Sequence, residues 1–205
     1  MISHALTIVV NELNSHLKDI YAMDTEIARP GNPSDGFDMS NNSSSRESVI
    51  FSVINIREEK TLKNQPNYLR DETTLKALYE NPPVFLNFQI LVMAPHANYS
   101  NGLLMISRVL RFFQYKNVFT QDNVQPASIT SNAPTNDLDC LESFKLIFDL
   151  YSPSMEEINH LWGTLGGKQY PFVIYWMRML DLKFSAPPQE GSLIQEVITD
   201  ITHKY

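Results

Sequence analysis

The sequence predicts a single domain of the α/β (α+β) class, with a central mixed β-sheet of about five strands flanked by helices. Three observations lead to this fold class. The chain has 205 residues, which is the length of one domain. Hydrophobic residues make up 43% of it and charged residues 19%, so there is enough apolar material for a core. Segments with helical periodicity also alternate with short apolar runs typical of strands. Residues 1–205 should therefore fold as one unit.

Two segments have apolar residues spaced three and four apart, as in amphipathic helices. Residues 3–20 form the first, with Ser3 as the expected N-cap. Its apolar stripe consists of Leu6, Val9, Val10, Leu13, Leu17 and Ile20. Residues 100–114 form the second, with Ser100 as the expected N-cap. Its apolar face consists of Leu103, Ile106, Leu110 and Phe113.

A third helix is predicted over residues 154–163. Ser154 and Glu157 have the spacing of a capping box, in which each side chain accepts a hydrogen bond from the other residue's backbone amide. The glycines at positions 163, 166 and 167 mark the end of this helix, because glycine adopts left-handed backbone at little cost.

The glycine cluster is followed by Lys168 and has some likeness to a phosphate-binding loop. That loop needs an earlier glycine at the position of Trp162 and a Ser or Thr at the position of Gln169. It also needs a strand before it and a helix after it, and here the order is reversed. A helix end followed by a turn is the better interpretation.

Five runs are expected to be strands. Residues 48–56 are β-branched and apolar. Residues 81–94 are almost continuously apolar after two prolines, which is typical of a central strand buried on both faces. Residues 142–151 alternate in polarity, so that Phe144, Leu146, Phe148 and Leu150 share one side. The other two strands are residues 118–120 and 171–184.

Three segments are expected to lie outside this framework. Residues 30–48 are rich in Pro, Gly, Asn and Ser and should form a flexible loop. Residues 59–80 are polar and are expected to form an excursion with one short helical turn. Residues 185–205 should form an extended C-terminal segment, because many of them are β-branched.

Alternating residues of this C-terminal segment are the predicted subunit interface: Val197, Thr199, Ile201 and His203. A strand that follows a turn-forming linker is able to pair with an adjacent chain by strand addition. The alternative is an edge strand that pairs within its own sheet.

Charge and cysteine content limit the partners. The net charge of −7 argues against nucleic acid, because phosphate binding requires a concentrated basic surface. The N-terminal residues resemble neither a secretion signal nor a membrane span. Cys140 is the single cysteine and cannot form an internal disulfide, which favours a reducing cytoplasm.

No pattern of catalytic, cofactor-binding or metal-ligating residues stands out. The histidines lack zinc spacing, and Glu157 with His160 is only half of a di-iron motif. Cys140 has no local signature of a nucleophile, so packing is its expected role. We therefore expect no cofactor and no enzymatic activity. Aromatic residues crowd residues 112–115 and 170–176, and those on the outer side of the strand must meet another layer or another subunit.

Several motifs together resemble one protein family. They are SVINIREEKTLKN, NPPVFLNFQILVMAPHANYSNGLLMISRVLRFFQ, NVFT and MEEINHLWGTLGGKQYPFVIYWMRML, in this order. The chain resembles, from the first helix to about Leu182, the cap or tail-terminator proteins of phage-tail-like contractile injection systems. Examples of such systems are the antifeeding prophage and the Photorhabdus virulence cassettes.

The resemblance implies a tail-terminator-like fold and a structural role. It implies a homo-hexameric ring that closes the distal end of the inner tube and sheath and fixes particle length. The partners would be tube and sheath proteins, with assembly in the bacterial cytoplasm and possible release of the particle. Two alternatives stay open: an adaptor or plug ring in the same particle, and a module that binds a cargo or small ligand.

Overall fold

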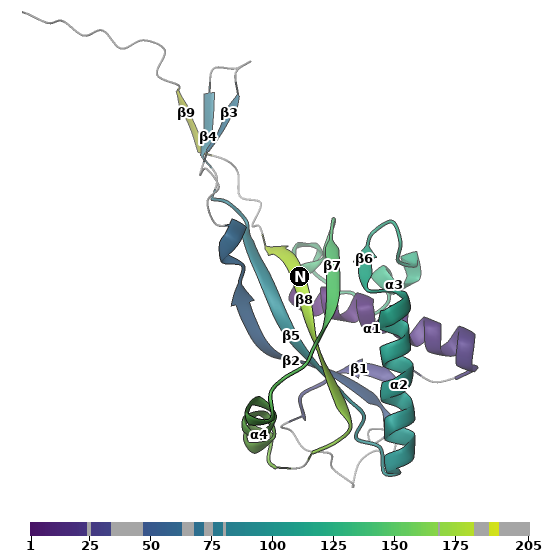
Figure 1. The fold of residues 1–205 in the computed structure, drawn as a ribbon. Helices are drawn as coiled ribbons and strands as arrows, with labels where there is room; N and C mark the ends of the chain where they lie inside the picture. The colour runs from purple at the N-terminus through teal and green to yellow at the C-terminus, as the bar shows by residue number, and fades with distance from the viewer. Residues whose placement is uncertain are drawn as a thin grey trace, which may run out of the picture.

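A six-stranded mixed sheet is the centre of the fold (Figure 1). The computed structural model describes residues 1–23, 26–33, 47–62, 68–71, 76–79, 81–167, 169–182 and 189–192. The strand order is β1-β2-β5-β8-β7-β6; β1 is parallel to β2, and all other neighbours are antiparallel. The six strands are β1 (Ala28–Pro30), β2 (Val49–Glu58), β5 (Val84–Met93), β6 (Val118–Thr120), β7 (Lys145–Tyr151) and β8 (Phe172–Leu182). The predicted fold class is confirmed.

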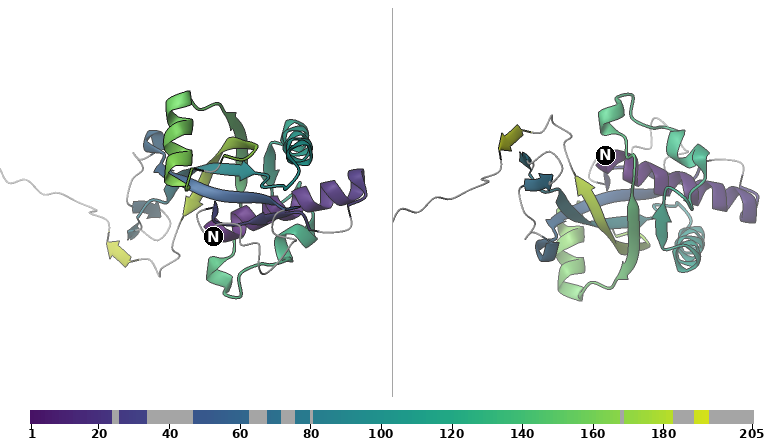
Figure 2. Two further views of the ribbon diagram at one scale, coloured as in Figure 1. Left: turned by 90° about the horizontal axis from the view of Figure 1, so that it is seen from below. Right: turned by 90° about the horizontal axis from the view of Figure 1, so that it is seen from above.

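Helices cover both faces of this sheet. Figure 2 shows α1 and α4 on opposite sides of it. The helical elements are α1 (Ile2–Tyr21), α2 (Tyr99–Tyr115), α3 (Pro126–Thr130), α4 (Met155–Thr164) and the 3-10 turns η3 (Lys60–Leu62) and η4 (Asp137–Asp139). The three helices expected from the sequence are all present, and η3 is the helical turn expected within residues 59–80.

The larger core lies between the sheet and the pair α1 and α2. On the α4 side of the bulges described below, odd-numbered residues of β8 and even-numbered residues of β5 face this core, so alternation fills it. At its centre the ring of Phe113 stacks on Phe148 at 4.8 Å and lies 4.5 Å from the ring of Tyr175. The helix stripe predicted for α1 supplies the facing side chains, because its members Leu6, Val9, Val10, Leu13 and Leu17 are buried.

A smaller core lies on the opposite face, under α4. Trp162 is the buried residue that α4 contributes, and it lies against the ring of Phe172 at 5.2 Å. The capping box predicted for this helix is present, with Ser154 and Glu157 in their expected roles. Gly166 and Gly167 after the helix have positive φ angles of 89° and 76°, which confirms the predicted helix end.

Two bulges bend the long strands at nearly the same level. In β2 the register shifts between Val53 and Asn55, and in the β5–β8 pair it shifts between Leu86 and Phe88. Each extra residue adds twist and reverses which side chains face the core. For this reason Leu180 of β8 is buried, although it is even-numbered and Tyr175 before the bulge is odd-numbered.

A second sheet of three strands stands beyond the ends of β5 and β8 (Figure 1). Its strand order is β3-β4-β9, and all pairs are antiparallel. The strands are β3 (Tyr68–Asp71), β4 (Lys76–Tyr79) and β9 (Gln189–Ser192). We call this sheet the arm. The sequence did not predict β3 and β4, because both strands are short and lie in polar surroundings.

Several local expectations are wrong for identifiable reasons. The first helix begins at Ile2, so Ser3 lies inside its first turn and Met1 takes the N-cap position. In α2 the N-cap is Asn98, whose Oδ1 accepts the amide of Ser100 at 3.0 Å. Three residues expected on apolar faces lie exposed at the edges of the core, namely Ile20, Leu103 and Leu150.

The expected loop at 30–48 is shorter than predicted. Pro30 belongs to β1, and the amide of Gly31 donates to the carbonyl of Phe51 at 3.0 Å. Residues 34–46, the middle of this loop, lie outside the described residues.

Candidate assembly surface

Within the described part of the chain, α4 covers one end of its side of the sheet. There α4 packs over Ile50, Leu91, Met93 and Ile174. Farther along the strands the same face carries polar, charged and aromatic side chains. We call this part the open face and define it by six residues: Asn55, Arg57, Gln89, Asp149, Trp176 and Arg178.

Alternation assigns these residues to the α4 side. Gln89 lies between Phe88 and Ile90, which face the larger core, and it must therefore face the other way. Trp176 lies in the same manner between Tyr175 and Met177. Register then brings the remaining members to the same face, since Asn55 pairs with Gln89 and Asp149 pairs with Trp176.

Cross-strand contacts hold the open face in place. The guanidinium of Arg57 lies 5.5 Å from the centre of the Trp176 ring, which is a cation–π distance. Arg178 Nε lies 3.0 Å from Asp149 Oδ2 in an ion pair whose side chains are 52% and 44% exposed. Asn55 Nδ2 donates to Gln89 Oε1 at 3.0 Å. Four strands thus present a row of side chains that contact one another across the sheet.

Tyr151 links the open face to α4. Its ring lies edge-on to that of Trp176 at 5.9 Å, and its hydroxyl donates to Glu157 Oε1 at 2.8 Å. The bond from the Ser154 amide, and then that from Tyr151, hold the pKa of Glu157 below its usual range. The same bond to Glu157 raises the pKa of Tyr151. Glu157 is therefore a carboxylate and Tyr151 a neutral donor at neutral pH.

The composition of the open face is that of a protein–protein contact. Trp, Tyr and Arg are the side chains most enriched among residues that dominate binding energy. A row of them on one face, beside a rim of ion-paired residues, matches the usual arrangement of an anchor and a polar surround. The arrangement is suited to docking.

Within the described residues, the two edges of the six-stranded sheet differ in how many residues lack a neighbouring strand. On the β6 side, β6 pairs with Lys145–Ile147, and the described residues supply no partner strand for β7 beyond Phe148. On the β1 side, β1 pairs with Val49–Phe51 only. The following residues of β2, from Ser52 to Arg57, have no neighbouring strand on that side within the described part of the chain.

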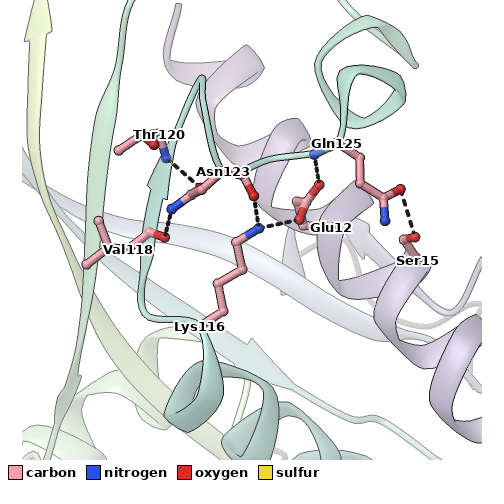
Figure 3. Close-up of polar contacts among 7 residues, drawn as sticks. All are labelled: Glu12, Ser15, Lys116, Val118, Thr120, Asn123 and Gln125. Atoms are coloured by element: carbon pink, nitrogen blue, oxygen red, sulfur yellow. Dashed lines mark hydrogen bonds and ion pairs between the residues drawn. The ribbon is translucent and has the colours of Figure 1, made fainter.

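A buried ionic cluster joins three segments that are distant in sequence (Figure 3). Lys116 Nζ lies 2.7 Å from Glu12 Oε2 and donates to the carbonyl of Asn123 at 2.6 Å. Glu12 Oε1 accepts the amide of Gln125 at 2.7 Å. Glu12 is only 6% exposed, so its charge depends on these partners. The cluster connects α1, the end of α2 and the start of α3, and sequence reasoning missed it.

Another missed residue is His4, which is buried in α1. Its Nε2 lies 2.9 Å from the carbonyl of Ile129, and its Nδ1 accepts the amide of Leu141 at 2.9 Å. These partners assign the neutral tautomer with the proton on Nε2. Cys140 is half-buried, with its Sγ 3.6 Å from the carbonyl of Pro134, in a packing environment.

Other site types were considered within the described residues. No group of three or more His, Cys, Asp and Glu residues there is placed to hold a metal ion. Among the described helices, none has the length and apolar character needed to span a membrane.

The predicted interface residues Val197, Thr199, Ile201 and His203 lie outside the described residues. Of the C-terminal segment, residues 189–192 are described, and they pair within the chain. Gln189–Ser192 form β9, which is antiparallel to β4 in the arm.

Comparison with known protein families identifies the family of this chain. The model of the Pvc16 N-terminal domain matches residues 4–196. The chain belongs to the Pvc16 N-terminal domain family. A search of curated proteins gives no significant match.

Two cryo-EM structures share the fold of this Pvc16-type domain. One is the sheath/tube terminator of the PVC extracellular contractile injection system in its extended state, with a TM-score of 0.54 and 14% identity over 97% of this chain. The other is the tube-terminating cap of the anti-feeding prophage, with a TM-score of 0.51 and 14% identity over 94% of this chain. This chain spans 63% and 60% of the lengths of those two chains. At this identity the likeness concerns the fold.

Proposed function

We propose that this chain is a structural cap, or tail terminator, of an extracellular contractile injection system. It would form a ring that closes the distal end of the inner tube and sheath and so fixes the length of the particle. The observation that carries this proposal is family membership over residues 4–196, together with a fold shared with two terminators. The open face supplies a surface with the composition of a protein contact.

The subunits would form a homo-hexamer and contact the tube and sheath proteins. In a closed ring each subunit uses two unlike surfaces, one toward each neighbour. This chain has unlike surfaces available: the open face, which is built of side chains, and the β2 edge, which presents backbone groups. Assembly would take place in the bacterial cytoplasm before the particle is released, and the role would be non-enzymatic.

Residues 193–205 would take part in this assembly as a strand that pairs with an adjacent chain. Val197, Thr199, Ile201 and His203 would form one face of that strand. Deleting residues 193–205 tests this role and leaves β9 intact. A folded subunit that no longer closes particles is the expected result, and an unfolded product would assign the segment to the subunit's own core.

Electron microscopy of particles from cells that lack this chain tests the main proposal. Loss of the cap should give open ends and tubes of irregular length, and re-expression of the chain should restore uniform particles. Particles of normal length and closure that lack a cargo would instead indicate a cargo-binding module. An adaptor ring would leave a defect at a different position along the particle. Negative-stain images of the purified protein should show six-fold rings.

A further inference from the structure

We propose that the β2 edge from Ser52 to Arg57 receives residues 193–205 of a second copy of this chain as an added strand. The inference rests on the proposed ring, because it requires a neighbouring subunit. We call this contact between two subunits the joint. It consists of the accepting β2 edge of one subunit and the donated segment of the other.

The backbone geometry defines which groups of this edge are available. The amide of Glu59 donates to the carbonyl of Phe85, and antiparallel alternation therefore directs Arg57 toward β5 and Ile56 away from it. Before the bulge, the amide of Val49 bonds to the carbonyl of Ile27 on the β1 side, and Val53 has the same outward direction. Val53 and Ile56 thus point their N–H and C=O groups out of the sheet, where no described strand pairs with them.

Apart from the bulge between Val53 and Asn55, this edge lacks the usual protection against strand addition. Natural edges are shortened, or carry proline or lysine that blocks pairing. The stretch from Ser52 to Arg57 contains neither residue, and Ile56 is an apolar side chain that is 50% exposed. The opposite edge is different, since the unpaired part of β7 is short and Pro153 follows it at once. Of the two edges of the six-stranded sheet, as far as the structure describes them, the β2 edge has the longer unpaired stretch and no proline or lysine in it.

The path of the chain indicates that the donor is another copy. Tyr79 of β4 pairs with Gln189, and Lys76 pairs with Ser192. Because Tyr79 is the end of β4 that leads into β5, β9 runs away from the six-stranded sheet and ends at the far end of the arm (Figure 1). The chain therefore leaves Ser192 while pointing away from its own β2. Fully extended, residues 193–205 would span about 40 Å.

The side chains of the segment match the two sides of the edge. Ile56 pairs with Phe88 and so lies on the α1 side, whereas Arg57 lies on the α4 side over Trp176. As a strand, the segment would have Val197, Thr199, Ile201 and His203 on one side and Asp200 on the other. A register that brings Ile201 beside Ile56 brings Asp200 to the side of Arg57. In this register the two isoleucine side chains would lie beside each other, and the carboxylate of Asp200 would lie near the guanidinium of Arg57.

Disulfide trapping in intact particles tests the joint. In a Cys140→Ser background, the pair Ile56→Cys and Ile201→Cys is introduced into the full chain, and purified particles are oxidised. A ladder of covalent oligomers on non-reducing gels is expected, up to the full ring. An internal disulfide within single chains would overturn the proposal, and so would the absence of any disulfide product.

A proline at an outward-facing amide provides a second, independent test. Ile56→Pro should prevent strand addition while leaving the β5 pairing intact, so particles should have open ends, as is expected for particles that lack the chain. Leu150→Pro is the matched control, because Leu150 is also an exposed edge residue, and its particles should remain closed. Circular dichroism of both variants verifies that each is folded. A folded Ile56→Pro variant that still closes particles would refute the joint.

The experiments can refute the proposed strand addition and the proposed cap function separately. If cells without the chain still make closed, uniform particles, the proposed function is wrong. If those particles are open, while Ile56→Pro particles are closed and no interchain disulfide forms, the cap function stands and the strand addition is wrong.

Discussion

On the side of α1 and α2, alternate residues of the three long strands are apolar and buried, whereas on the α4 side the apolar residues end where α4 ends. The first face is a continuous core built around Phe113 and Phe148. The second face changes within one strand, from Ile174 under α4 to the half-exposed Trp176 two residues later. Both faces belong to the same strands, so the difference lies in what covers them. On this comparison, stability should come mainly from the first face, and the second face is the proposed contact surface.

The largest effect should come from the core face. Phe113→Ala removes the ring at the centre of the aromatic cluster and leaves a cavity between α2 and the sheet. We expect the free energy of unfolding to fall by about 4 kcal/mol, measured by urea denaturation. Leu103→Ala on the exposed side of the same helix is the control and should change little. Equal losses in the two variants would contradict the assignment of the core.

The buried ionic cluster should produce the next largest effect. Glu12→Ala leaves Lys116 without its carboxylate partner, and we expect a loss of about 3 kcal/mol. The double variant Glu12→Met with Lys116→Met removes both charges and should recover much of this loss, because no unpaired charge remains. Thermal unfolding of the three proteins measures the comparison. A double variant that is no more stable than Glu12→Ala would show that packing, and not charge pairing, is the role of Glu12.

The open face should contribute little to folding. Trp176→Ala removes a half-exposed ring, and we expect the free energy of unfolding to fall by about 1 kcal/mol. Particle closure, scored by electron microscopy, should nevertheless be reduced if this face contacts a neighbour. The proposed difference between the two faces would be wrong if Trp176→Ala unfolds the protein. It would also be wrong if a folded Trp176→Ala variant closes particles as well as the natural chain does.

The sequence was sufficient for elements whose apolar pattern is local. The periodicity of α1 and α2, the capping box of α4 and the alternation in β7 each lie within a few turns or residues, so one window of sequence contains the evidence. The expectation that aromatics on the outer side of β8 must meet another layer is also partly confirmed, because Tyr170 and Phe172 pack against Trp162 of α4.

Features that depend on distant pairs could not be predicted. Glu12 and Lys116 are 104 residues apart, and no local pattern marks either as a member of a buried pair. The bulges at Val53–Asn55 and Leu86–Phe88 depend on the register between strands, which no single strand determines. The apolar run of β5 indicated burial on both faces, and the structure shows Gln89 on the open face because α4 is too short to cover it.

The smallest effect concerns His16, on the side of the core formed by α1 and α2. Its ring lies among the rings of Tyr21, Phe112 and Tyr115, at centroid distances of 6.3, 5.1 and 6.3 Å. Burial lowers the pKa of His16, and Arg111 adds to this while Asp19 opposes it. Between the lowered folded pKa and the ordinary unfolded value of about 6.5, the unfolded chain binds more protons.

Stability should therefore increase with pH through that interval, and the contribution should be lost as pH falls below about 6.5. His16→Phe keeps an aromatic ring in the cluster and removes the titration, so its stability should depend less on pH from 7.5 down to 5.5. Urea unfolding of both proteins at several pH values in this range measures the difference in slope. Parallel curves for the two proteins would show that His16 titrates at its ordinary pKa and that the aromatic cluster does not shield it from water. A steeper curve for His16→Phe would mean that Asp19 outweighs burial, and that the sign of the shift is reversed.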